Sequence, residues 1–276
     1  MYLFDQQRAL LSMLLMIVFS TSALVQANES SQLLDIINSK HRSEINKERD
    51  IYRHPLQTLD FFQIKPEMTV VEIWPGEGWY TEILAPYLKN GGGRFIAAGF
   101  PQHAGSQWRQ DMQADYQSWL TASPELYDKV KVIELGPPSY WTIGPDDSVD
   151  AVLTFRNVHN WLKGDYNTEM FQAFYHVLKP GGILGITDHR AANDTNLATM
   201  KTSGYLSQDL VIELAKKAGF VLEETSEINA NPRDTKDYPK GVWTLPPTLR
   251  LGDQARKHYL TIGESDRMTL RFRKPM

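Results

Sequence analysis

The sequence predicts an α/β protein built on a mostly parallel sheet with helices on both faces. Short apolar runs of strand length alternate along the chain with segments of helix length, and this alternation implies right-handed βαβ units. The composition, with 42% hydrophobic and 22% charged residues, is that of a globular protein. No internal repeat or low-complexity linker divides the 276 residues, so we expect one domain with an N-terminal extension.

Residues 1–27 predict a secretory signal peptide. A single Arg8 precedes an apolar run over residues 9–19, and Val25-Gln26-Ala27 is typical of a cleavage site. The run is shorter than the roughly 20 apolar residues of a membrane-spanning helix, although an uncleaved anchor is the alternative. We therefore predict cleavage after Ala27, a periplasmic or secreted protein, and no stable membrane insertion after cleavage.

An N-terminal helical extension is predicted over residues 28–65. A polar helical stretch covers about residues 30–53, and His54-Pro55 breaks it. One short helix over residues 56–62 then ends before Pro66.

Seven apolar runs bounded by turn residues are the predicted strands. The first follows Pro66 and precedes a Pro-Gly turn, and the second follows the glycine-rich turn at residues 90–93. The strands are expected at residues 69–73, 95–98, 130–135, 151–155, 183–186, 221–224 and 268–272.

Four longer helices are expected between these strands. The segment over residues 81–88 places apolar residues on one face, and a Lys-Pro-Gly-Gly run stops another helix. Ser207 can cap a further helix that Gly219 closes. The helices are expected at residues 81–88, 107–120, 170–178 and 207–218.

Composition excludes several classes of site. The chain has no cysteine, so thiolate catalysis, a redox pair of cysteines and a zinc–thiolate site are excluded. The 29 Lys and Arg and 33 Asp and Glu give a net charge of -4 without a basic stripe, so we expect no nucleic-acid partner. Ligands of parallel sheets bind beyond the carboxyl ends of the strands, and we expect a small-molecule site there.

The segment after the first strand, VVEIWPGEGWYT at residues 70–81, is the most informative one. Its glycines allow the backbone to approach a ligand closely, and the following helix N-terminus favours negative charge. It is not a P-loop, because no Gly-Lys-Ser/Thr follows, and it lacks the third glycine of a dinucleotide fingerprint. A tight strand-to-helix turn without a ligand is the alternative.

Several segments resemble the class I S-adenosylmethionine (SAM)-dependent methyltransferases. An acidic residue before a glycine loop resembles the first motif of that family, and LKPGGIL at residues 178–184 resembles its approach to strand five. More narrowly, RHPLQTLDFFQIKP, EIWPGEGWYTEILAPYL, DHRA and LRFRKP resemble a family of predicted exported methyltransferases. The resemblance implies a Rossmann-like class I methyltransferase fold over residues 66–276. Its sheet would have seven mostly parallel strands with an antiparallel last strand, and an insertion or lid at about residues 229–266.

The resemblance also implies SAM as the cofactor. Two features differ from the family pattern: Trp74 stands at the first glycine of the loop, and Gly99-Phe100 stands where an acidic residue commonly binds the ribose. Phe100 could instead stack on the adenine. The predicted cofactor-binding residues are Glu72, Trp74, Pro75, Gly76, Gly78, Phe100, Arg156 and Asn157.

Polar residues gather after strands four and five. Either histidine, His159 or His189, could act as a general base that Asp188 orients. Arg190, like Arg156, could hold an anionic substrate bidentately. The predicted catalytic residues are His159, Asp188, His189 and Arg190. The alternative is structural, with Asp188 paired to Arg190 and Asn157 capping the next turn.

A metal site at His159, Asp188 and His189 is a competing interpretation. The chain has no H-x-x-x-H or comparable spacing, so we predict no metal.

Aromatic residues and a long connection complete the predicted pocket. Trp74, Trp79, Tyr80 and Trp161 follow strands one and four and could form apolar walls. The connection before strand seven could be a lid that carries Trp243 and Arg250, or a packed arm at the sheet edge.

These observations support three functions. The leading one is SAM-dependent methyl transfer to a small molecule in the periplasm. The second is a methyltransferase fold repurposed as a non-catalytic periplasmic ligand-binding protein. The third is a metal-dependent hydrolase or lyase that uses His159, Asp188 and His189.

Overall fold

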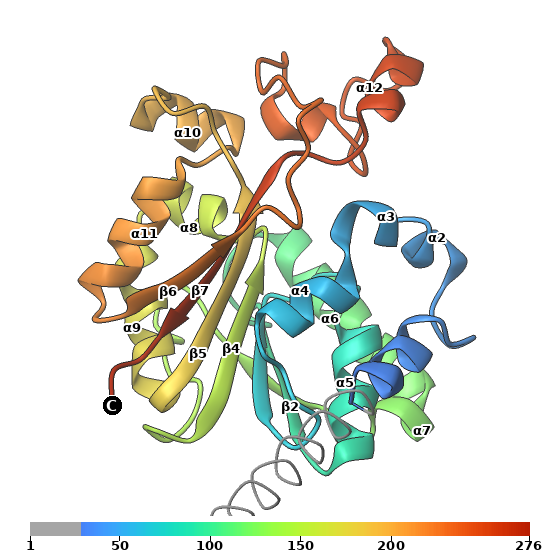
Figure 1. Cartoon of the computed structure of the whole chain (residues 1–276), viewed down its shortest axis with the longest axis vertical. Coiled ribbons are helices and arrows are strands. Elements are labelled where there is room, and N and C mark those ends of the chain that lie inside the picture. The colour runs from blue at the N-terminus through green and yellow to red at the C-terminus, as the bar shows by residue number, and fades with distance from the viewer. Residues whose placement is uncertain (1–28) are drawn as a thin grey trace, which may run out of the picture.

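Seven strands form one sheet in the order β3-β2-β1-β4-β5-β7-β6 (Figure 1). The fold is described from a computed structural model, which covers residues 29–276. The predicted signal peptide lies outside the described residues. Within residues 29–276, no helix is long and apolar enough to cross a membrane.

The direction of the strands confirms the predicted sheet. Neighbours among β1 to β5 pair in parallel, and β7 runs antiparallel between β5 and β6. All seven predicted strands are present. Strand β5 begins before its predicted start, because Leu178 pairs with Val149 of β4 and residues 181 and 182 form backbone hydrogen bonds with Lys274, just after β7. The strands are β1 Thr69–Ile73, β2 Arg94–Gly99, β3 Lys131–Glu134, β4 Val149–Phe155, β5 Leu178–His189, β6 Val221–Ser226 and β7 Arg267–Arg273.

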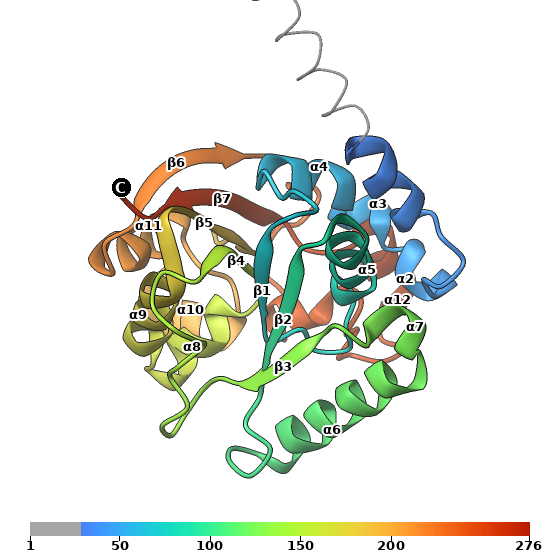
Figure 2. The ribbon, with the colours of Figure 1, turned by 90° about the horizontal axis from the view of Figure 1, so that it is seen from below.

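Helices cover both faces of the sheet (Figure 2). The four longer helices lie where the sequence predicts them, and Ser207 caps α11 by accepting a hydrogen bond from the Leu210 amide. Residues 29–37 are also helical. The remaining helices are α2 Glu44–Lys47, α3 Asp50–Arg53, α4 Pro55–Phe61, α5 Thr81–Gly91, α6 Gln107–Ala122, α7 Pro124–Tyr127, α8 Val158–Gly164, α9 Asn167–Val177, α10 Leu197–Ser203, α11 Gln208–Lys217, η1 Gly241–Thr244 and α12 Arg256–Ile262.

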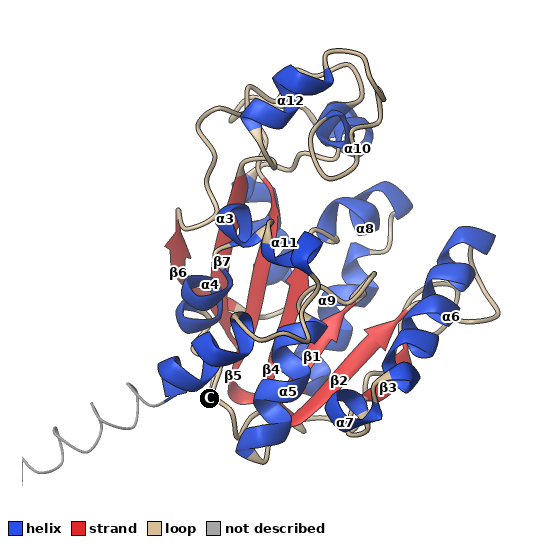
Figure 3. Cartoon of the chain, turned by 90° about the vertical axis from the view of Figure 1, so that its right-hand side faces the viewer, coloured by secondary structure: helices blue, strands red, loops and turns tan. Residues whose placement is uncertain are grey.

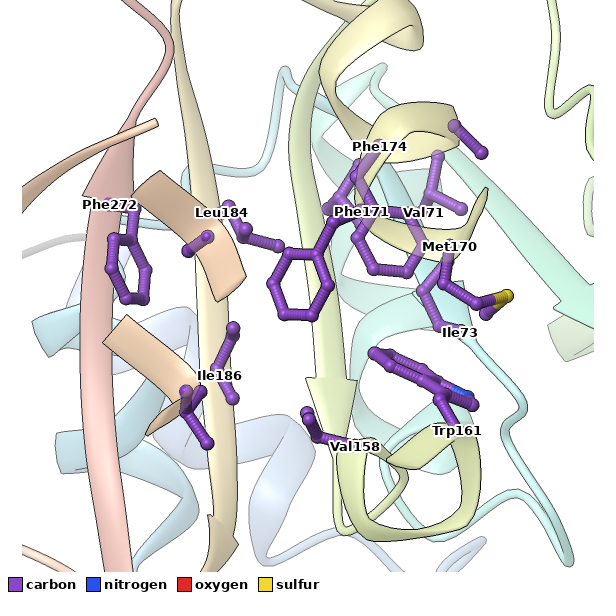
Figure 4. Packing of buried hydrophobic residues seen from close by; sticks show 14 of the residues in the cluster. Val71, Ile73, Val158, Trp161, Met170, Phe171, Phe174, Leu184, Ile186 and Phe272 are labelled. Carbon is purple, nitrogen blue, oxygen red and sulfur yellow. The ribbon is translucent and has the colours of Figure 1, made fainter. Parts of the chain in front are cut away.

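The core is divided by the sheet into two apolar layers. Val71 and Ile73 of β1 face the layer under α8, α9 and α11, where Trp161 and Phe174 are fully buried (Figure 4). Val70 faces the opposite layer, which α4, α5 and α6 cover. The alternation along β1 follows the two-residue period of a strand that is buried on both faces.

The N-terminal extension is more broken than predicted. Residues 30–53 form separate short helices, because Arg42 is buried and paired with Asp50 at 2.7 Å, which folds the chain back on itself. Ser43 caps α2, and His54 has a left-handed φ of 42° before Pro55, which ends α3 and starts α4.

Candidate active site

The glycine turn after β1 has one crowded side and one open side. Gly78 has a φ of +83°, and a Cβ there would lie 2.7 Å from the ring of Trp119. Gly76 has a φ of +61° and no heavy atom within 4 Å of a Cβ position. A cleft of about 380 Å³ adjoins Gly76 and the side of α6 that carries Asp111 and Trp119. The turn is therefore open to a ligand at Gly76.

The indole of Trp74 fills the space between the ends of β1, β2 and β3. Trp74 has a left-handed φ of 48° and is 4% exposed. Its Nε1 donates to the carbonyl of Leu135 at 2.8 Å, and its ring centroid lies 4.6 Å from that of Phe100. Arg109 lies 4.8 Å from the same indole. The indole therefore packs on Phe100, the ring predicted to stack on adenine.

The end of β2 carries no acidic side chain at Gly99 or Phe100, and the side-chain amide of Gln113 packs against it. Gln113 of α6 accepts a hydrogen bond from the Phe100 amide at 2.9 Å. A Cβ on Gly99 would lie 2.0 Å from the same Gln113 oxygen, so a larger residue there would require the Gln113 side chain to move. A ribose at this edge would meet a neutral amide in place of a carboxylate.

Glu72 is a buried acid beside the turn. It is 3% exposed, and its carboxyl accepts a hydrogen bond from Thr81 at 2.9 Å, while Tyr116 contacts the same hydroxyl at 3.0 Å. Burial raises the pKa of Glu72 to about 8, against the smaller opposing effects of Thr81 and Arg53. The carboxyl is therefore largely protonated at neutral pH.

Arg156 and Asn157 end β4. Arg156 has a left-handed φ of 62°. Asn157 donates from Nδ2 to the carbonyl of Ile73 at 2.8 Å, which joins the end of β4 to the end of β1. Asn157 stands at the N-cap of α8 but its side chain makes no capping bond, so its role is to hold the two strand ends together.

Three of the four predicted catalytic residues converge. His159 Nδ1 lies 3.0 Å from Asp188, which is fully buried and also accepts from the His189 amide at 2.7 Å. The rings of His159 and His189 lie 5.2 Å apart. Because Asp188 accepts, Nδ1 of His159 carries the proton and Nε2 is the basic nitrogen. The arrangement is that of a histidine base held by a buried carboxylate.

His189 is buried to nearly the same extent as His159. Burial lowers its pKa well below the ordinary value, and the charges of His159, Arg156 and Arg267 lower it further. Its Nδ1 lies 2.5 Å from the hydroxyl of Ser265. His189 is therefore neutral at pH 7.

The same three residues could hold a metal ion. One ligand atom from each of His159, Asp188 and His189 lies within 4.8 Å of the others. The three residues come from the end of β5 and from the start of α8, which follows the neighbouring strand β4, so a search for a local ligand spacing in the sequence could not detect them.

Arg190 is engaged elsewhere. Its guanidinium pairs with Glu227 at 2.6 Å and with Asp266 at 2.9 Å, and not with Asp188 as the structural alternative expected. These ion pairs join the end of β5 to the segment before β7. The catalytic role predicted for Arg190 finds no support in its contacts.

Most of the predicted aromatic wall belongs to the core. Trp79 and Tyr80 are 5% and 4% exposed, and Trp161 is fully buried. Tyr80 stacks on Phe155 with centroids 3.5 Å apart. These buried rings therefore brace the strand ends.

The connection between β6 and β7 forms one wall of a second cleft. This cleft measures about 670 Å³ and is lined by Trp243 and Arg250 of the connection and by Asn160 and Lys163 of α8. The Trp243 ring lies 6.0 Å from that of His159. Asp234 anchors the connection through buried hydrogen bonds, from Tyr205 at 3.0 Å among others. The connection therefore packs against the rest of the protein in this structure and also borders His159.

Three charged residues beside the cluster were not among the predicted site residues. Arg53 of α3 and Arg267 of β7 are 3% exposed, and both pair with Glu264, which is equally buried. The predicted topology could have identified them. An antiparallel last strand begins at the ligand edge of the sheet, so the residues before it and at its start lie near the site.

No protein-family model and no curated protein matches this sequence. Solved structures do. A SAM dependent methyltransferase from Aquifex aeolicus is 19% identical over 66% of this chain and 87% of its own, with a TM-score of 0.52. Phosphoethanolamine N-methyltransferase 2 from Haemonchus contortus, in complex with S-adenosyl-L-methionine, is 17% identical over 82% of this chain and 53% of its own, with a TM-score of 0.55. The cyclase SpnF is 15% identical over 81% of each chain, also with a TM-score of 0.55. This likeness establishes the Rossmann-like class I methyltransferase fold.

Proposed function

We propose that this protein is a SAM-dependent methyltransferase that acts on a small molecule in the periplasm. The observation that carries the proposal is the His159–Asp188 pair at 3.0 Å, which stands at the same carboxyl edge of the sheet as the open glycine turn after β1. Both features stand at the edge of the sheet where ligands bind in this fold, and the structures from Aquifex aeolicus and Haemonchus contortus have a similar fold. The periplasmic location is part of the proposal and rests on the segment at residues 1–27.

The residues of the turn fit SAM in part. Gly76 is open, so a ligand can reach the backbone amides that follow it. The ring of Phe100 is already covered by the Trp74 indole, at 4.6 Å. Adenine therefore stacks on Phe100 only after the indole leaves, and the left-handed φ of Trp74 is a strained conformation that favours such a change.

Methyl transfer from SAM requires no covalent intermediate with the protein. SAM supplies an activated methyl group, and the chain has to orient the acceptor and remove a proton. His159 Nε2 would accept that proton, while Asp188 holds the ring in the required tautomer. Removal of such a base lowers turnover by about 10²–10⁴-fold.

The test uses the purified protein and SAM that carries a radioactive methyl group. We expect label to enter a low-molecular-weight product when a small-molecule extract of periplasm is added, and His159→Gln to abolish this transfer while SAM still binds. SAM binding without any labelled product would favour the non-catalytic alternative. Absence of SAM binding to folded protein would contradict the cofactor assignment.

A metal-dependent reaction is the second candidate, because three ligand atoms of His159, Asp188 and His189 lie within 4.8 Å. It requires stoichiometric metal in the purified protein by elemental analysis, and loss of that metal in His159→Ala. Metal below one tenth of an equivalent after incubation with zinc and dialysis would remove this candidate.

A further inference from the structure

Three arginine side chains surround one buried glutamate where β7 begins, and a fourth arginine, Arg156, stands directly after β4 at the same edge of the sheet. Glu264 accepts from Arg49 at 2.7 Å and from Arg53 at 3.2 Å, and it lies 3.1 Å from Arg267 Nη1. Burial would raise the pKa of Glu264, but these three arginines and Arg156 hold it well below its ordinary value. Figure 3 shows α3, which carries Arg53, beside the end of the sheet where β7 starts. We call Arg49, Arg53, Arg156 and Arg267 the arginine cage.

The charges of the cage do not balance. The cage has four guanidinium groups and one carboxylate, that of Glu264, so its net charge is +3. Asp266, the next carboxylate along the chain, pairs with Arg190 at 2.9 Å and with Lys236 at 2.8 Å. Glu72 adds no full negative charge, because burial raises its pKa to about 8. Unpaired positive charge is costly to hold in a protein interior, and an anion bound among these guanidinium groups would offset that cost.

Hydrogen-bond donors of the cage are also unmet. Arg49 Nη2, Arg53 Nη2 and Arg267 Nε are buried and have no partner among residues 29–276. Arg156 is partly exposed and forms no ion pair with any residue in the described range. A guanidinium that reaches solvent beside buried unmet donors gives an anion both an entrance and partners.

The cage adjoins the proposed base. Arg267 of β7 pairs with His189 of β5 in the antiparallel register, and Ser265, the residue after Glu264, places its hydroxyl 2.5 Å from His189 Nδ1. A ligand whose anionic end lies in the cage therefore has its other end near the two histidines.

We propose that the arginine cage binds an oxyanion group that carries two or more negative charges, as in a phosphate monoester or a dicarboxylate. Guanidinium forks match the oxygen spacing of both groups, and a dianion would offset most of the +3 charge of the cage. The assignment of this anionic group to the methyl acceptor rests on the proposed function. The binding of an anion by the cage is independent of the proposed function.

The test measures anion binding without SAM. The purified protein is titrated by calorimetry with inorganic phosphate and with malonate, each against sodium chloride at the same ionic strength. We expect saturable binding of at least one dianion, and the preferred one identifies the class. Arg156→Gln should weaken it by about ten- to a hundredfold, the effect of one charge-assisted contact. Arg94→Gln, which removes the same charge from an exposed site at the start of β2, should leave it unchanged.

A second variant tests the charge argument if Arg156→Gln unfolds. Glu264→Gln removes the carboxylate that neutralises part of the cage. We expect a lower Tm than wild type in sodium chloride and a larger phosphate-dependent rise in Tm. No saturable binding of either dianion by the wild type, equal binding by Arg156→Gln, or a smaller rise in Glu264→Gln would each overturn the proposal. The same samples are also titrated with SAM. Loss of anion binding with SAM binding retained contradicts only the cage, and loss of SAM binding contradicts only the cofactor site.

Discussion

Trp74→Gly is the substitution that most directly tests how this protein could bind SAM. The indole is 4% exposed, packs on Phe100 at 4.6 Å and donates to Leu135 at 2.8 Å. Glycine removes the ring and also relieves the left-handed φ of 48°. The variant therefore presents Phe100 to a ligand without a prior rearrangement.

The expected gain in SAM affinity follows from the free energy that displacement of the Trp74 indole costs the wild-type protein. A buried tryptophan hides about 150–250 Å², which at ~25 cal/mol per Å² is about 4–6 kcal/mol. The hydrogen bond to Leu135 adds about 1 kcal/mol, and relief of the left-handed backbone returns about 1–2 kcal/mol. A displaced indole keeps part of its contacts, so we expect SAM to bind about ten- to a thousandfold more tightly to Trp74→Gly.

Calorimetric titration of both proteins with SAM measures this difference, and urea unfolding checks the fold. We expect the variant to be less stable by about 3–5 kcal/mol, as for other large-to-small core substitutions. Trp79→Phe is the control, because it alters a buried tryptophan of the same turn that lies 4.6 Å from Arg53 and away from Phe100. SAM affinity that is equal to or weaker than wild type in folded Trp74→Gly would refute the reasoning.

Three further predictions follow from the site. Gly76→Arg should abolish SAM binding by filling the open side of the turn, whereas Gly92→Arg, with a φ of +81° and equally free space at the end of α5, should bind SAM normally in the same titration. His159→Gln should lower turnover at least about a hundredfold with unchanged SAM affinity, and turnover equal to wild type would remove it as the base. Burial raises the pKa of Glu72 from 4.5 to about 8, so the folded state holds its proton where the unfolded state loses it. Stability should therefore fall by up to about 1.4 kcal/mol per pH unit between these values, and Glu72→Gln should flatten that fall in urea unfolding measured across pH; an identical slope would contradict it.

The sequence predicted the parts of the fold that local pattern controls. The apolar runs placed all seven strands, and Ser207 and Gly219 predicted the ends of α11 because caps act within one turn. Residues at the ends of neighbouring strands, such as His159 and Asp188, could be paired because the topology of the sheet brings them together.

What the sequence did not predict depends on distant contacts. The direction of the Trp74 indole is set by Phe100 and Leu135, which belong to other strand ends. Arg53 and Glu264 are separated by 211 residues, and no local pattern in the sequence connects them. Their pairing arises only when the extension packs on the start of β7, so neither propensity nor periodicity could reveal it.

The most direct measurement of the central claim is calorimetric titration of the wild-type protein with SAM and with S-adenosylhomocysteine. If the open turn at Gly76 is a cofactor site, both ligands bind with one-to-one stoichiometry and compete with each other. A folded protein that binds neither ligand, in the wild type and in Trp74→Gly alike, would contradict the claim that this sheet edge is a SAM site.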